Sequence, residues 1–268
     1  MEYALRVDRP EAVPDGPEIS DDPEWAGTLP GGRWAALYFG AEFCEQALPG
    51  PREAEELCRA ALARGLEPVL LTPVVTAGGL RVVEDLLRTL EARGLRPAVV
   101  FNDWGVFRLL RRRFPGHPAR AGRLFNRGLR DPRASPGASR GTGSARLRRF
   151  LAREGVGALE TDVDLGGEYL GHRGDGLGRA VHLPFAFVTS GRNCLLKGEA
   201  LGRGELSRCL GAPCPRPCRG GPRRVVRGDT PRTLWRAGNT VFQRVSPAGA
   251  RTYLARADRV VIHPRPMP

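Results

Sequence analysis

Residues 67–114, EPVLLTPVVTAGGLRVVEDLLRTLEARGLRPAVVFNDWGVFRLLRRRF, alternate short apolar runs with amphipathic stretches. The runs Glu67–Thr72 and Pro97–Phe101 have the length and composition of buried strands. Gly79–Ala92 and Trp104–Phe114 carry apolar residues at helical spacing. Strands that alternate with helices in this way form βα units around a mainly parallel sheet, so the stretch predicts an α/β fold.

The same alternation continues on both sides of this stretch. Further strands are expected at Trp34–Phe39, Arg123–Phe125, Gly157–Glu160, Val181–Thr189 and Asp258–His263, and further helices at Arg52–Arg64 and Ala145–Glu154. The spacing favours a (β/α) TIM-barrel-like fold, complete or distorted, over an open doubly wound sheet. No Gly-rich fingerprint follows the first strand, which weakens a dinucleotide-binding interpretation.

Length and composition suit one large domain. The chain has 268 residues, of which 41% are hydrophobic, so it can bury a sizeable core. Residues 1–29 are acidic and Pro-rich and are expected to form a loosely packed N-terminal extension, with residues 30–268 as a single barrel-like domain. Neither a signal-like N-terminus nor an apolar run of about 18 residues is present. We therefore expect a cytoplasmic protein without a membrane span.

The net charge of +13 has two interpretations. It could mark a nucleic-acid surface, because arginine binds phosphate well. However, Lys197 is the sole lysine, and the abundance of Arg, Gly, Pro and Ala is typical of a GC-rich coding bias. The densest basic stretches are Arg108–Arg113, Arg146–Arg153 and Arg219–Arg227. The first two have helical spacing and are more often solvated faces, so RNA binding is kept as an alternative.

Cysteines cluster near the C-terminal end of the chain. Cys194, Cys214 and Cys218 lie in GRNCLLKGEALGRGELSRCLGAPCPRPCRG, and Cys44 in LYFGAEFC follows the first predicted strand. Clustered thiols without a secretory signal usually hold a metal or perform redox chemistry. Cys44 and Cys194 each follow a strand, so both should lie at the carboxyl edge of the barrel. The sequence thus predicts one shared four-cysteine site.

Four thiolates suit either an iron–sulfur cluster or a structural zinc ion. Structural zinc more often uses a C-x2-C pair, whereas this chain offers two single cysteines and the C-x3-C pair of Cys214 and Cys218. An iron–sulfur cluster is therefore favoured over zinc, and free or disulfide-forming thiols are the third alternative. Cys209 is an alternative to Cys44 as the fourth ligand, and Cys58 is expected to be a buried core thiol.

Polar residues follow several of the predicted strands. In parallel α/β folds, such positions form the active face. The candidate pocket residues are Glu42, Asn102, Asp103, Asn126, Arg127 and Glu160. The four histidines show no metal-binding spacing and are expected to be structural or surface residues. No GxSxG motif or Ser/His/Asp set is evident, so a hydrolase is not supported.

Five segments carry a family resemblance. LYFGAEFC, NDWGVFRLL, GRLFNRGLRDPR, HLPFAFVTSGRNCLL and CPRPCR together resemble the collagenase-like peptidase family U thirty-two, from about Trp34 to the C-terminus. The early cysteine and the HLPFAF stretch resemble the UbiV type within it. The resemblance implies a barrel-like fold and a [4Fe–4S] cluster on Cys44, Cys194, Cys214 and Cys218. Two features depart from the family pattern: the long interval before Cys214, which contains Cys209, and the continuation CEQA after the early cysteine.

The resemblance also implies a function. Relatives of this type take part in oxygen-independent hydroxylation, either of a quinone-ring precursor in anaerobic ubiquinone biosynthesis or of tRNA and rRNA bases. In the quinone branch a UbiU-like paralogous subunit is the expected heterodimer partner. The peptidase name is largely historical for this family. A protease and a zinc-stapled binding module are the less favoured alternatives.

Overall fold

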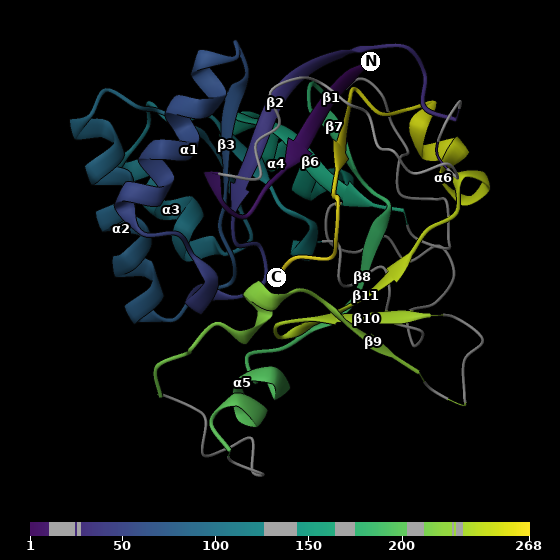
Figure 1. The fold of residues 1–268 in the computed structure, drawn as a ribbon. Helices are drawn as coiled ribbons and strands as arrows, with labels where there is room; N and C mark the ends of the chain where they lie inside the picture. The colour runs from purple at the N-terminus through teal and green to yellow at the C-terminus, as the bar shows by residue number, and fades with distance from the viewer. Residues whose placement is uncertain are drawn as a thin grey trace.

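The computed structural model describes residues 1–10, 25, 28–125, 144–163, 175–202, 212–226, 228 and 233–268. Eight strands, each parallel to both neighbours, close into a barrel in the ring order β1-β2-β3-β4-β5-β6-β7-β12 (Figure 1). The predicted TIM-barrel-like fold is confirmed, and the open sheet is excluded because β12 pairs with both β7 and β1.

The barrel strands and outer helices occupy most of the predicted positions. The strands are β1 (Glu2–Arg6), β2 (Arg33–Gly40), β3 (Glu67–Leu71), β4 (Ala98–Phe101), β5 (Ala119–Ala121), β6 (Val156–Asp162), β7 (Gly178–Leu183) and β12 (Arg259–Ile262). The helices that follow β2 to β5 are α1 (Pro51–Ala63), α2 (Ala77–Ala92), α3 (Trp104–Arg113) and α4 (Ala145–Arg153). Their apolar faces pack on the outer side of the strands and form the largest core, as the helical periodicity predicts.

The inside of the barrel is lined largely by small side chains. Every second residue of a barrel strand points to the inside, because alternate residues of a strand face the same side of the sheet. The interior apolar cluster is Ala4, Ala36, Tyr38, Val69, Leu71, Ala98, Val100, Ala180 and Val261. Four alanines in this set leave room for the larger polar side chains that occupy the rest of the interior.

An insertion separates β7 from β12. It consists of β8 (Phe185–Ser190), α5 (Leu195–Ala200), the short 3-10 helix η7 (Pro217–Gly220), β9 (Arg223–Val225), β10 (Leu234–Ala237), β11 (Thr240–Arg244) and α6 (Pro247–Leu254). Its four strands form an antiparallel sheet in the order β8-β11-β10-β9. In Figure 1 this sheet lies below the barrel, at the end towards which the barrel strands run. The insertion therefore covers the end where TIM-barrel proteins place their sites.

Three local expectations are corrected by the structure. The N-terminal segment is not loose throughout, because Glu2–Arg6 form β1, which closes the barrel between β2 and β12. The strand expected at Arg123–Phe125 lies earlier, at Ala119–Ala121, and 123–125 form a 3-10 turn. The single strand expected over Val181–Thr189 is two strands, β7 and β8, which belong to different sheets on either side of Pro184.

Within the described residues, none of the helices combines the length and the apolar character needed to cross a membrane.

Leu87 tests the packing of the helices on the barrel. Its side chain lies in α2 and is fully buried in the main core. Leu87→Ala should lower the free energy of unfolding by about 2–5 kcal/mol, because it leaves a cavity in a close-packed layer. Arg88, the next residue, is 61% exposed, and Arg88→Ala should change the stability by less than about 0.5 kcal/mol. Urea denaturation of the two variants measures both values, and equal losses would contradict this packing.

Candidate functional site

Four cysteines lie on three loops at the carboxyl end of the barrel. Cys44 follows β2 and precedes the 3-10 helix η2 (Glu45–Ala47). Cys194 follows β8 and is the N-cap of α5. Cys214 and Cys218 belong to the segment that ends in η7. All four are free thiols of intermediate exposure, whereas Cys58 is fully buried in α1, as predicted for a core thiol.

Side chains from the insertion hold these loops together. The Asn239 side-chain amide, in the turn between β10 and β11, donates to the carbonyl oxygen of Phe43 at 2.7 Å and of Gly191 at 2.5 Å. It thus joins the loop that carries Cys44 to the loop that carries Cys194. Arg216, between the paired cysteines, donates from Nη2 to the Leu48 carbonyl oxygen at 3.0 Å. The third loop is thereby fixed to the first.

The four thiols affect one another's pKa. Burial, together with the neighbouring Cys194 and Cys218, raises the pKa of Cys44 to about 11. Burial also raises the pKa of Cys218, with added contributions from Cys194 and Cys214. The pKa of Cys194 is raised by burial and by Cys214. Every one of the four thiols therefore lies within electrostatic reach of at least two others. A shared site for all four stays a prediction.

Backbone amides point at two of the sulfurs. Cys194 Sγ accepts from the Lys197 amide, and Cys214 Sγ accepts from the Arg216 amide, both at 3.4 Å. Arg216 has φ 54° and ψ 50°, a left-handed conformation that is rare for residues other than glycine. It lies between Pro215 and Pro217, so the turn is stiff. Amide donors of this kind stabilise thiolates and tune metal–sulfur centres.

The donor set fits a metal–thiolate centre. Soft thiolate ligands select zinc, Cu(I) and iron–sulfur clusters. In the part of the chain that the structure describes, however, no three or more His, Cys, Asp or Glu side chains are gathered closely enough to hold a single ion. Cys209 lies outside the described residues, so its place as an alternative ligand stays a prediction.

A buried charge network lies between the barrel and the cysteine loops. The Arg123 guanidinium, fully buried after β5, donates from Nε to both carboxylate oxygens of Glu42 at 3.0 and 3.1 Å and from Nη2 to Oε2. Its Nη1 donates to Asp162 Oδ1 at 2.6 Å. The Phe43 ring covers the guanidinium at 5.2 Å, and the amide of Phe187 in β8 donates to Asp162 Oδ2 at 3.3 Å. The network thus connects three barrel strands to the insertion.

A second polar chain fills the barrel interior. His182 Nδ1 lies 2.7 Å from His263 Nε2, and His182 Nε2 lies 2.8 Å from Glu160 Oε2. Glu160 also accepts from the Tyr38 hydroxyl at 3.0 Å and from Arg120 Nε at 2.5 Å. Burial lowers the pKa of both histidines. Burial alone would raise the pKa of Glu160, but Arg120 and His182 outweigh it and lower that pKa to about 2.

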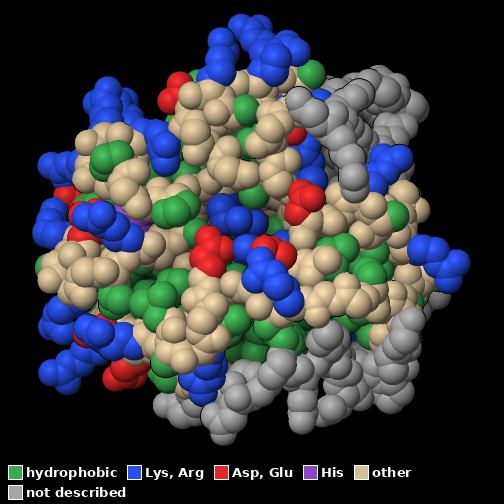
Figure 2. All heavy atoms as spheres, turned by 90° about the horizontal axis from the view of Figure 1, so that it is seen from above, with side chains coloured by type: hydrophobic (Ala, Val, Ile, Leu, Met, Phe, Trp, Pro, Cys, Tyr) green, Lys and Arg blue, Asp and Glu red, His purple; other side chains and the backbone are tan. Residues whose placement is uncertain are grey.

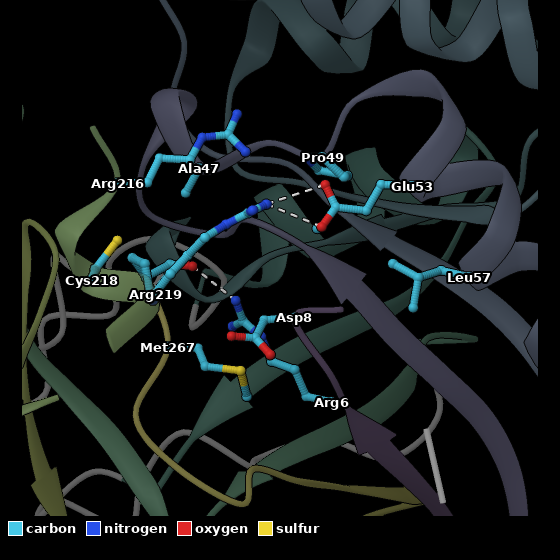
Figure 3. Close-up of a pocket in the computed structure, with 12 residues that line it drawn as sticks. Arg6, Asp8, Ala47, Pro49, Glu53, Leu57, Arg216, Cys218, Arg219 and Met267 are labelled. Carbon is cyan, nitrogen blue, oxygen red and sulfur yellow. Dashed lines mark hydrogen bonds and ion pairs between the residues drawn. The ribbon is translucent and has the colours of Figure 1, made fainter. Parts of the chain in front are cut away.

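A cleft opens beside the cysteines. Its cavity volume is about 40 Å³, and the cleft is partly open to solvent. Figure 3 shows the residues that line it, which come from the ends of β1 and β2, from the start of α1, from η7 and from the C-terminal segment. They are Arg6, Asp8, Gly40, Ala47, Pro49, Glu53, Leu57, Arg216, Cys218, Arg219, Met267 and Pro268.

The candidate pocket residues lie in different places. Glu42 and Glu160 belong to the two buried networks rather than to the lining of the cleft. Asn102 bonds the Thr72 carbonyl oxygen and the Leu124 amide, and Asp103 caps α3 through the Gly105 amide at 2.6 Å. These bonds are structural, and neither Asn102 nor Asp103 lines the cleft.

Asn126 and Arg127 lie outside the described residues. A catalytic role for any of the six candidate pocket residues stays a prediction.

Several residues of this region were not anticipated from the sequence. Arg6 lies in a segment expected to be loose, and Arg123 in an expected strand. His182 is the second-last residue of β7, and His263 directly follows the neighbouring strand β12. The period of 2 in these strands points both histidines into the barrel, and this is the signal that could have found them.

The amino end of the barrel, opposite the cysteines, is a mixed charged surface. Arg259 donates to Glu2 Oε2 and to Glu67 Oε2, each at 2.7 Å. Figure 2, which views the molecule from above, shows acidic side chains beside basic ones near the middle of this face and basic side chains around its edge. On this face the positive charge is spread over the periphery and does not form one patch.

Comparison with known proteins adds one likeness. Neither a protein-family model nor a curated protein matches the chain. A solved structure described as "The Structure of the U32 Peptidase Mk0906" has a TM-score of 0.47 and 14% sequence identity, covering 100% of this chain and 94% of that one. A likeness of this size carries no argument about family or activity, and the barrel itself rests on the strand pairing described above.

The buried histidines and Glu160 predict how stability depends on pH. The unfolded chain takes up protons near pH 6.5 at the histidines, whereas the folded chain does not, because the pKa of His182 and of His263 is lowered. The free energy of unfolding should therefore fall as the pH drops below about 6.5. It should fall again between about 4.5 and 2, where Glu160 is protonated only in the unfolded chain.

Urea titrations between about pH 7 and pH 5 measure the upper part of this dependence. His263→Gln should flatten it, because that side chain no longer titrates. A wild-type midpoint that stays constant or rises on acidification would contradict the assignment.

Proposed function

We propose that this chain binds a [4Fe–4S] cluster through Cys44, Cys194, Cys214 and Cys218 and works in an oxygen-independent hydroxylation system. The observation that supports the proposal is that three separate loops, fixed to one another by Asn239 and Arg216, place four thiols at the carboxyl end of a parallel barrel, near enough to affect one another's pKa. Cysteines bind a metal as thiolates, so a bound metal would draw these sulfurs closer and keep them deprotonated.

Iron–sulfur is favoured over zinc for two reasons. A zinc ion would have to draw all four sulfurs to about 2.3 Å from one point, whereas a cluster spans ligands that are set further apart. The amides that donate to Cys194 and Cys214 are also of the kind that sets cluster potentials. A zinc-stapled binding module remains the outcome if metal analysis returns zinc.

The bound cluster would supply one-electron transfer. The residues of this chain would hold the cluster and orient its ligands. Asn239 and Arg216 fix the loops that carry the cysteines, and Arg123 fixes the strand ends that lead to Cys44 and Cys194. Cys218 lines the cleft, so a molecule bound there would lie beside the cysteine site. Apolar and charged side chains are mixed in the lining, which would suit a small aromatic group with polar substituents.

A quinone precursor is the substrate that we favour. It is supported by the resemblance of LYFGAEFC, HLPFAFVTSGRNCLL and CPRPCR to the UbiV type. That resemblance also suggests a UbiU-like paralogous subunit as partner. The side chains of Val188 and Leu195 are 43% and 40% exposed on β8 and α5, next to the cysteine loops. They would suit a contact with such a subunit.

RNA is the second candidate substrate. The net charge of +13 and the arginine-rich helices α3 and α4 favour it, because phosphate contacts dominate RNA affinity. The scattered distribution of basic side chains in Figure 2 favours it less than one continuous basic patch would.

Metal analysis tests the cluster. Protein purified without oxygen should contain about four irons and four sulfides per chain and should absorb broadly near 400 nm. Cys44→Ala should lose most of the iron, because it removes one of four ligands. Cys58→Ala is the matched control, since Cys58 is buried in α1, and it should keep the full iron content. Cys209→Ala should also keep it. Zinc, or full iron in Cys44→Ala, would refute this ligand set.

Gene deletion tests the substrate. Cells that lack this chain should lose ubiquinone when grown without oxygen and keep it when grown with oxygen, because a parallel oxygen-dependent route would remain. Cells that produce Cys194→Ala instead should show the same loss, and Cys58→Ala should restore quinone. Unchanged anaerobic quinone together with a missing hydroxylated nucleoside in tRNA or rRNA would favour the RNA candidate instead.

A further inference from the structure

Two connections between the cysteine loops are made by side chains already described. Asn239 joins the loop of Cys44 to the loop of Cys194. Arg216 joins the segment of Cys214 to the loop of Cys44. A connection between Cys194 and Cys214 would complete the set, and it would lie where α5 and η7 contact one another.

Lys197, in α5, makes this third connection. Its backbone amide donates to Cys194 Sγ at 3.4 Å. Its ammonium donates to the carbonyl oxygen of Ala212, two residues before Cys214. One residue therefore contacts both segments of the insertion that carry cysteines, through its backbone on one side and its side chain on the other.

The ammonium of Lys197 is buried beside a neutral partner. The residue is 9% exposed, and a lysine is seldom buried unless an anion accompanies it. Within the part of the chain that the structure describes, no carboxylate forms an ion pair with it. Glu199, the acidic residue of α5, is engaged by Arg223 and Arg236. The insertion thus buries a cation that none of these carboxylates balances.

The cysteines can supply the balancing charge. They bind metals as thiolates, so a loaded site carries negative charge. Burial raises the pKa of Cys194, and the positive charge of Lys197 opposes this rise, so the two groups interact. The Lys197 amide lies 3.4 Å from the sulfur, and an extended lysine side chain adds roughly 7 Å beyond its own amide nitrogen. At the resulting distance of about 10 Å or less, one charge inside a protein changes an equilibrium about tenfold.

The choice of lysine suits this position. Lys197 is the sole lysine among 42 basic residues, and all the others are arginine. A guanidinium carries five N–H donors in a wide planar fork, whereas an ammonium is a compact point charge with three donors. A compact cation can be buried against a single backbone carbonyl oxygen with fewer donors left unpaired.

We propose that Lys197 is a positioning residue of the cysteine site, which holds the segment of Cys214 on α5 and places a fixed positive charge beside the thiolates. The inference rests on the proposed function, because the charge acts on a bound centre. A reduced cluster carries one more negative charge than the oxidised one. A fixed cation beside it therefore raises its reduction potential, which depends on the charges and hydrogen bonds around the sulfurs.

The reduction potential tests the charge. In protein purified without oxygen and titrated with dithionite, Lys197→Met should have a lower midpoint potential, because the neutral side chain no longer favours the reduced state. The equilibrium constant for reduction should fall about tenfold, which is about 59 mV for one electron. Lys197→Arg keeps the charge and should stay closer to wild type. Arg224→Met removes an exposed charge from β9 of the same insertion and should leave the potential unchanged.

Amide hydrogen exchange of the metal-free protein tests the positioning role separately. Without the bond from the ammonium to Ala212, residues 212–221 should exchange about tenfold faster in Lys197→Met than in wild type, whereas α2 should be unaffected. The iron content of the same preparations distinguishes the two proposals. Wild type without iron would refute the cluster, and the exchange rates would then decide the role of Lys197.

Two results would overturn the inference: an equal potential in wild type and Lys197→Met, or unchanged exchange of residues 212–221 in that variant. If Lys197→Met does not fold, the potential of Lys197→Gln decides, since glutamine is also neutral and can still donate a hydrogen bond. A wild-type potential in Lys197→Gln would remove the role of the charge.

Discussion

The buried guanidinium of Arg123 is the interaction on which the site region depends. It joins Glu42 after β2 to Asp162 at the end of β6, and it lies against the Phe185 carbonyl oxygen at the start of β8. Removing such a cation from water is costly, and the cost is met only when its donors are matched by carboxylates. Both matching carboxylates are present. Since Glu42 is two residues before Cys44, and β8 leads to Cys194, this arginine sets the origin of two of the three cysteine loops.

Small residues inside the barrel leave room for a buried polar network. Four alanines in the interior cluster leave space that Tyr38, Glu160 and His182 fill with one hydrogen-bonded chain. Polar groups so deep in a protein are stable only when nearly all their bonds are made. Arg6 departs from this rule at the end of β1, and departures of this kind are expected at functional sites rather than in ordinary cores.

The sequence predicted the repetitive part of the fold well. The period-3.6 pattern of Gly79–Ala92 and the apolar run Pro97–Phe101 are local signals, and α2 and β4 lie there. The sequence did not predict β1, because its five residues are too few to show an alternation of apolar and polar side chains, and an acidic, Pro-rich segment follows them. β7 and β8 were merged because both are apolar, and nothing in their composition shows that the chain changes sheets between them.

For the site, the positions after strands placed Cys44 and Cys194 at the same end of the barrel, although Cys194 follows β8, which is not a barrel strand. The shared four-cysteine centre stays a prediction. Pairs such as Arg123 with Glu42 join residues 81 positions apart. No local pattern in one sequence records such a pairing, because it depends on how the whole barrel closes. The hydrogen bonds of Asn102 and Asp103 could not be foreseen for the same reason.

The distribution of the cysteines between two parts of the fold has a consequence for how these parts are held together. Cys44 belongs to the barrel, whereas Cys194, Cys214 and Cys218 belong to the insertion between β7 and β12. A centre held by all four would rivet the insertion to the barrel. Without such a centre, the contacts of Asn239, Arg216 and Arg123 would be left to hold the cysteine loops of the insertion against the barrel.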